Sequence, residues 1–132
     1  MLKGIAASDG IAIGRVLLLK KEIPVIMRTV ISESEISSQL RILENALKKS
    51  ISQLKAIQSE SDENMSLILD SHIMILEDTE LINAIRLKIE TGKQDAVSAA
   101  DETLRFFADM FRGMKNDYMK ERSEDITDID HR

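Results

Sequence analysis

The first 31 residues differ in pattern from the rest of the chain. β-Branched residues are frequent there and glycines interrupt them, which is typical of strands and turns. We predict strands at residues 2–7 and 11–19, joined by a turn at residues 8–10. The unbroken apolar run at residues 16–19 indicates a strand buried on both faces, which needs a sheet around it. Since the rest of the sequence offers almost no further strands, this β segment is predicted to belong to an incomplete α/β domain.

From Ser32 onward, apolar residues recur every three or four positions, as on one face of a helix. This period predicts a first long helix that begins at Ser32 or Ser34 and ends before a polar break at residues 59–64. A second helix follows and ends at Gly92. Asp78 is expected to cap a fresh turn inside this second helix and to kink it.

Two more helices are predicted in the last third of the chain. One spans residues 95–110 and is ended by Gly113, and the other starts at Asn116 or Asp117 and shows no C-terminal cap signal, which suggests truncation. Helices joined by short polar breaks pack as antiparallel bundles. We therefore predict a mainly α fold: an antiparallel four-helix bundle of two hairpins in residues 32–132, preceded by the β segment at 1–31.

Composition narrows the class of protein. The 132 residues are 43% hydrophobic, which is enough for one domain with a real core. A net charge of -5 and few aromatic residues argue against nucleic acid as a ligand. No stretch approaches the roughly 20 apolar residues that span a bilayer, and the amino terminus does not resemble a signal peptide. The absence of cysteine fits a reducing compartment, so we expect a cytoplasmic protein without membrane contact.

Charge is unevenly distributed along the chain. Residues 56–85 contain no Lys or Arg but carry several acids, namely Glu60, Asp62, Glu63, Asp70, Glu77, Asp78 and Glu80. Within this stretch, acids and large apolar residues alternate around a lone histidine. An acidic surface with apolar residues favours a basic protein partner.

His72 can be read as a metal ligand, as a phosphoryl acceptor or as a surface contact. Its helical neighbours Ile75 and Leu76 cannot coordinate a metal, and no glycine-rich loop lies nearby to stabilise a phosphoryl group. An interface histidine is the preferred interpretation. His131 lies too close to the chain end to be assigned a role. No motif in the sequence performs chemistry by itself, so no catalytic residue and no metal ligand are predicted.

Three motifs carry a resemblance to a known family. These are residues 4–14 (GIAASDGIAIG), residues 72–78 (HIMILED), and residues 117–122 (DYMKER) followed by residues 125–129 (DITDI). In this order they resemble enzyme I of the bacterial phosphoenolpyruvate:sugar phosphotransferase system. The likeness spans the chain but corresponds to the amino-terminal part of that family, before its phosphohistidine motif and its phosphoenolpyruvate-binding barrel.

The resemblance implies a function and a partner. In that family the opening strands belong to an α/β phosphohistidine domain, and the helices form an inserted domain that docks the small phosphocarrier protein HPr. The parent enzyme uses Mg²⁺ to pass a phosphoryl group from phosphoenolpyruvate through a histidine to HPr, whereas this part is expected to be inactive alone and to need no cofactor. Carried over by motif, the docking residues are Asp70, His72, Met74, Ile75, Asp78, Glu80, Leu81, Phe111, Tyr118, Met119 and Arg122.

A scaffold protein, rather than a docking domain of an enzyme, is the alternative function that stays open. The helices would then form a self-associating scaffold that does not bind HPr, with the surface around His72 as a dimer interface. The exposed edge of residues 11–19 would also favour a homodimer, because unpaired strands add to a second copy. An independent enzyme has the least support.

Overall fold

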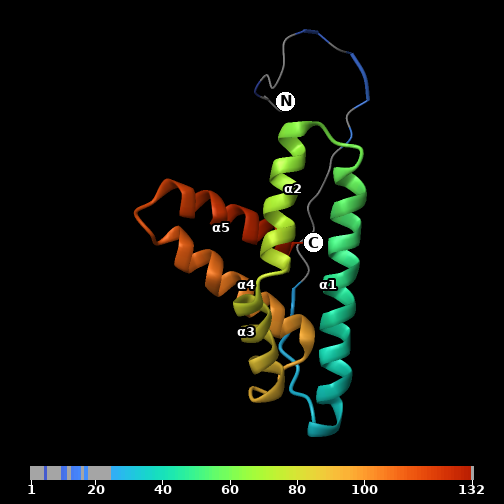
Figure 1. Ribbon diagram of the computed structural model, residues 1–132, viewed down its shortest axis with the longest axis vertical. Helices are drawn as coiled ribbons and strands as arrows, with labels where there is room; N and C mark the ends of the chain where they lie inside the picture. The colour runs from blue at the N-terminus through green and yellow to red at the C-terminus, as the bar shows by residue number, and fades with distance from the viewer. Residues whose placement is uncertain (1–4, 6–9, 12, 16, 18–24, 132) are drawn as a thin grey trace.

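A computed structural model describes residues 5, 10, 11, 13–15, 17 and 25–131 of the chain (Figure 1). Within these residues the fold is mainly helical, as predicted, but the predicted number of helices is wrong. A short 3-10 turn, η1 (Glu33–Glu35), precedes five α-helices rather than four. They are α1 (Ile36–Gln58), α2 (Glu63–Leu76), α3 (Thr79–Glu90), α4 (Ala96–Arg112) and α5 (Asp117–Asp130).

The fifth helix arises because the predicted second helix is divided at Asp78. This residue has an extended backbone (φ -66°, ψ 119°), so the helical ladder stops. Its carboxylate Oδ1 then accepts hydrogen bonds from the backbone N–H groups of Glu80 (2.8 Å) and Leu81 (3.0 Å), which satisfies the free donors at the start of α3. The predicted kink is therefore a complete helix break, at the residue where the sequence placed it.

The helices form two hairpins set at an angle. In Figure 1, α1 and α2 lie side by side and run in opposite directions, while α4 and α5 form a second pair that leaves the first one obliquely. α4 packs most extensively against α5, and α3 packs mainly against α4. The splayed arrangement leaves a hollow between the end of α2, the start of α3 and the α4–α5 pair.

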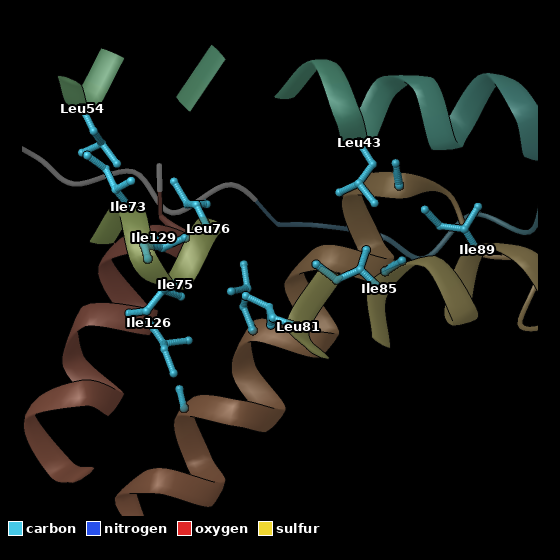
Figure 2. Packing of buried hydrophobic residues seen from close by; sticks show 14 of the residues in the cluster. Leu43, Leu54, Ile73, Ile75, Leu76, Leu81, Ile85, Ile89, Ile126 and Ile129 are labelled. Atoms are coloured by element: carbon cyan, nitrogen blue, oxygen red, sulfur yellow. The ribbon is translucent and has the colours of Figure 1, made fainter. Parts of the chain in front are cut away.

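The core runs through all five helices. Leu54 of α1 and Ile89 of α3 are fully buried. Figure 2 shows Ile73 of α2 close to Leu54, and Ile126 and Ile129 of α5 beside the end of α2. The apolar stripes read from the sequence thus supply this core, as their helical period predicted.

Residues 25–31 run along the helices and are tied to the loop between α3 and α4. The N–H of Ile31 donates to the carbonyl of Lys93 (2.9 Å), and the N–H of Asp95 donates to the carbonyl of Thr29 (3.1 Å). Val30 and Gln94 form an isolated antiparallel bridge, which is the only β pairing among the described residues. The strands predicted at 2–7 and 11–19 fall largely outside the described residues, and the residues of those ranges that are described belong to no strand.

No helix in the described part of the chain combines the length and the apolar character that crossing a membrane requires.

Candidate functional site

The hollow between the two hairpins is an open groove of about 400 Å³ with an apolar floor. Four helices contribute to it: the end of α2, the start of α3, the second half of α4 and most of α5, from Tyr118 to Ile126. Its lining residues are Met74, Ile75, Asp78, Glu80, Leu81, Phe107, Met110, Phe111, Tyr118, Met119, Arg122 and Ile126. An apolar floor with a few charged side chains is the composition expected of a binding surface.

The groove brings together every predicted docking residue except Asp70 and His72. Among those that line it, Met74 and Tyr118 are largely exposed, with 62% and 59% of their surfaces accessible. Ile75 and Leu81 are buried and contribute to the floor. The groove therefore offers both a packed base and exposed apolar side chains to an incoming surface.

Asp70 is exposed, and its side chain reaches toward α1. Its Oδ1 accepts a hydrogen bond from Nε2 of Gln58 in α1 at 2.6 Å. It lies one helical turn before Met74 on α2. Asp70 therefore contributes negative charge near the groove without lining it.

His72 lies between α2 and α5 rather than in the groove lining. Only 14% of its side chain is exposed, and Nε2 is 3.4 Å from Oδ1 of Asp125. This contact has the distance of an ion pair but not the geometry of a hydrogen bond, since Nε2 has no hydrogen-bond partner among the described residues. His72 thus packs against α5 outside the groove lining, and its contact with a partner stays a prediction. The described residues contain no group of three or more His, Cys, Asp or Glu side chains that could hold a metal ion.

Asp78 and Glu80 place negative charge at the edge of the groove for a local reason. Asp78 is the N-cap of α3 and Glu80 lies in its first turn. Carboxylates are favoured at this end of a helix because its free N–H groups carry partial positive charge. The same preference that starts α3 therefore makes this part of the groove acidic.

Arg122 is the only cation among the described residues that line the groove. Its guanidinium carbon lies 5.9 Å from the centre of the Tyr118 ring, one helical turn earlier on α5. Its Nη1 donates a hydrogen bond to the hydroxyl of Ser71 on α2 at 2.7 Å. One positive group and two acids thus line the same apolar groove.

Three groove residues were not among the predicted docking residues. Phe107 and Met110 lie on the same face of α4 as Phe111, and Ile126 lies one turn after Arg122. Their helical spacing was the available signal, but this spacing equally describes core residues. Phe107 and Phe111 meet edge to face, with ring centres 6.4 Å apart.

A second hollow of about 260 Å³ is lined by residues of α1, α3 and α4, together with the ends of α2 and α5. Its charged lining residues, among those described, are Asp101 and Asp130, which share the guanidinium of Arg105 at 2.8 Å and 3.6 Å. Burial and the nearby Asp101 carboxylate raise the pKa of Asp130, while Arg105 opposes the shift. Because both of its acids are already paired, this hollow is less suited to a charged partner than the groove.

Comparisons with known proteins agree with the fold. The family described as "PEP-utilising enzyme, N-terminal" matches residues 3–122. Phosphoenolpyruvate-protein phosphotransferases of Geobacillus stearothermophilus and Priestia megaterium are 38% and 39% identical to the chain over 136 aligned residues, which cover 99% of it. The chain spans only 23% of the length of these relatives.

A solved structure supports the same assignment at the level of the fold. A solution NMR structure of an Enzyme I protein has a TM-score of 0.76 to this chain at 23% sequence identity, and the match covers 83% of this chain and 46% of the other. The family resemblance predicted from the three sequence motifs is thereby confirmed. The chain belongs to the family of PEP-utilising enzyme amino-terminal regions and is homologous to the amino-terminal part of enzyme I, the phosphoenolpyruvate-protein phosphotransferase.

Proposed function

We propose that this chain is the HPr-docking part of a phosphoenolpyruvate-protein phosphotransferase, and that the groove is its docking surface. The observation that carries the proposal is the convergence of residues 74–81 and 111–122, far apart in sequence, on one apolar groove. These two stretches are the ones that the family resemblance assigns to HPr binding. The relatives' name supports a protein as the phosphoryl acceptor of the parent enzyme.

The proposed division of the chain follows the same reasoning. Residues 32–132 would be the helical docking domain, and residues 1–31 the lead-in from an α/β phosphohistidine domain. The bridge between Val30 and Gln94 supports a boundary here, because it ties the lead-in to the start of α4 just before the first helical turn.

The contribution of this part to catalysis would be positioning. Holding HPr beside the parent enzyme would bring the two histidines into line and reduce the entropic share of the barrier to phosphoryl transfer. No residue of the groove is assigned a chemical step. The described residues offer no cluster of ligands for the Mg²⁺ of the parent enzyme, so none of them is assigned to it.

Two physical effects would drive docking. Covering the exposed side chains of Met74 and Tyr118 removes apolar surface from water, which supplies binding free energy. The acids at the edge, Asp78 and Glu80, would attract a basic partner surface and orient it. Affinity should therefore fall as salt rises, while the apolar contribution persists.

The test is an NMR titration of the isotopically labelled chain with HPr at low and moderate salt. We expect saturable shifts confined to the amides of residues 70–81 and 111–122, weakened by salt. An unchanged spectrum at low salt would refute docking.

Two exposed apolar residues of α2 make a matched pair for this titration. Met74 lines the groove, whereas Leu67, equally exposed at 64%, does not. We expect Met74→Ala to weaken HPr binding by roughly tenfold and Leu67→Ala to leave it unchanged, because only the first loses buried contact area. Equal effects of both substitutions would show that the groove is not the docking surface.

Self-association is the alternative function, and exposed apolar residues before α1 favour it. Ile11, Ile13 and Leu17 are almost fully accessible in the structure. Sedimentation of the chain and of a variant that starts at Ser32 separates the two functions. A shortened chain that is monomeric and binds HPr supports docking, whereas a shortened chain that dimerises and does not bind HPr supports a scaffold.

A further inference from the structure

A polar chain of contacts lies behind the groove, between α2 and α5. The hydroxyl of Ser71 donates a hydrogen bond to Oδ2 of Asp125 at 2.7 Å and accepts one from Nη1 of Arg122 at 2.7 Å. Arg122 and Asp125 are three residues apart on α5, so both side chains reach the same side of the helix. A single serine of α2 thus connects a cation and an anion of the facing helix.

The surroundings strengthen these contacts. Ser71, Arg122 and Asp125 are all half-buried, and the other oxygen of the Asp125 carboxylate lies 3.4 Å from Nε2 of His72. Hydrogen bonds gain strength where water is partly excluded. A hydroxyl that donates to a carboxylate is also a better acceptor, so Asp125 reinforces the bond that Ser71 receives from Arg122.

The side chain of Arg122 lines the groove while a hydrogen bond to Ser71 restrains part of its guanidinium. One N–H is bonded to Ser71, and Tyr118 lies near the guanidinium. A guanidinium has five N–H donors, so others stay available for an acceptor on a docked partner. Without the serine, the flexible side chain would be free to turn toward Asp78 or Glu80, the acids of the same groove.

We propose that Ser71 and Asp125 are positioning residues that hold the Arg122 guanidinium ready for partner binding. This inference rests on the proposed docking function. Neither residue lines the groove, so both act through Arg122. Their contribution is preorganisation: the side chain is ordered before binding, and less entropy is lost when the partner arrives.

A double-mutant cycle on HPr affinity tests this role. The variants are Ser71→Ala, Arg122→Ala and the pair together. We expect Ser71→Ala to weaken HPr binding by roughly three- to tenfold in the wild-type background and by less than about twofold when Arg122 is already alanine. An equal loss in both backgrounds would mean that Ser71 acts through the general structure, and would overturn the proposal.

Asp125→Asn gives a second, chemically conservative test. It keeps the size of the side chain but removes the charge that polarises Ser71, so binding should weaken by roughly two- to fivefold. Asp128→Asn is the matched control, because Asp128 is exposed on the same helix. Equal effects of the two substitutions would reduce the role of Asp125 to net charge and would contradict the proposal.

The free protein provides a readout that needs no partner. NMR of the Arg122 side-chain Nε–Hε group should show slower rotation of the guanidinium in the wild type than in the Ser71→Ala variant. An unchanged Arg122 signal in Ser71→Ala would overturn positioning even if HPr binds. If the wild type shows the restrained guanidinium but does not bind HPr, the proposed function fails and the contact network stands.

Discussion

The two junctions that flank α3 use the same local chemistry for different purposes. At the α2–α3 junction, Asp78 caps α3 through backbone N–H groups of the next turn. At the α3–α4 junction, Asp95 caps α4 in the same way, with Oδ1 accepting from the N–H groups of Val97 (3.1 Å) and Ser98 (3.0 Å). Both aspartates have extended backbones, and the two caps are alike in their local geometry.

Their tertiary surroundings make the difference. Asp78 lines the groove, so its charge contributes to that surface. Asp95 uses its second oxygen inside the fold, accepting hydrogen bonds from the N–H of Thr29 (3.0 Å) and the hydroxyl of Ser98 (2.5 Å). A capping residue can therefore be predicted from the sequence, whereas its further role depends on what the fold places beside it.

The largest expected effect comes from the buried face of α3, which should stabilise this helix more than its N-terminal cap does. Ile89 is fully buried next to the α3–α4 junction, so Ile89→Ala should lower the free energy of unfolding by about 3–4 kcal/mol through lost contacts and a cavity. Leu87→Ala, two residues away and exposed, should change it by less than about 0.5 kcal/mol. Urea denaturation measures both, and similar losses would show that burial does not set the stability of α3.

Removing the structural cap should have the next largest effect. Asp95→Ala loses the cap of α4 and the bond to Thr29, and should destabilise the protein by about 2 kcal/mol in urea denaturation. HPr affinity should be unchanged, because Asp95 is remote from the groove lining. A loss of HPr binding in a folded Asp95→Ala variant would contradict the distinction between the two junctions.

The contribution of Asp95 to the stability of the protein should depend on pH. Its burial opposes ionisation, but hydrogen bonds from Ser98, Thr29 and Val97 outweigh that effect and lower the pKa of Asp95 below its usual value of 3.8. A carboxyl with a lowered folded-state pKa stabilises the fold above the usual value, and this stabilisation is lost as pH falls through the lowered pKa. The stability difference between wild type and Asp95→Asn should therefore shrink in urea denaturation below about pH 4, whereas a constant difference would argue against an ionised Asp95.

Gly92 tests the geometry of the α3–α4 junction. A Cβ at this position would lie 2.6 Å from the carbonyl oxygen of Lys88, which also accepts a hydrogen bond from the N–H of Gln94 at 3.3 Å. Gly92→Ala must push this backbone apart and should cost about 1–2 kcal/mol in urea denaturation. Gly113→Ala is the control, since its Cβ would meet only ordinary contacts at 3.5 Å.

The smallest expected effect on stability belongs to Asp78. Asp78→Asn keeps the cap, so the free energy of unfolding should change by less than about 0.5 kcal/mol. HPr binding should weaken by roughly threefold at low salt, because one negative charge leaves the groove. Asp78→Ala should lose both the cap and the charge, and calorimetric titration with HPr separates the two variants. An unchanged HPr affinity in Asp78→Asn would show that the charge at the α2–α3 junction plays no part in HPr binding.

Much of the helical framework could be predicted because it depends on near neighbours. Asp78 and Gly92 were identified as a cap and a helix end from residues within a few positions of them. Even so, the left-handed backbone conformation falls on Lys93 (φ 51°) rather than on Gly92, which serves instead to avoid a clash. The α2–α3 break was predicted as a kink, because sequence locates a cap but does not say how far the chain turns there.

The candidate site was predictable only in part. The family motifs named residues on α2, α3 and α5 that do converge on the groove, but they also named His72, which the fold packs against Asp125. Phe107 and Met110 were missed because a helical apolar stripe looks the same whether it faces the core or a groove. The Ser71–Arg122 contact spans 51 residues and has no signature in the local pattern.

The sequence by itself determined most of the helix boundaries, the apolar faces of the helices, and the family to which the chain belongs. The helix boundaries and apolar faces follow from caps and periodicity within one or two helical turns, whereas the family follows from three sequence motifs. Only the tertiary structure decided that Ile75 is buried while its neighbour Met74 is exposed. It also decided that Arg122 of α5 donates a hydrogen bond to Ser71 of α2. The physical reason is that the oblique packing of the two hairpins is set by the combined contacts of all five helices, and the groove exists only where that packing leaves an apolar face uncovered.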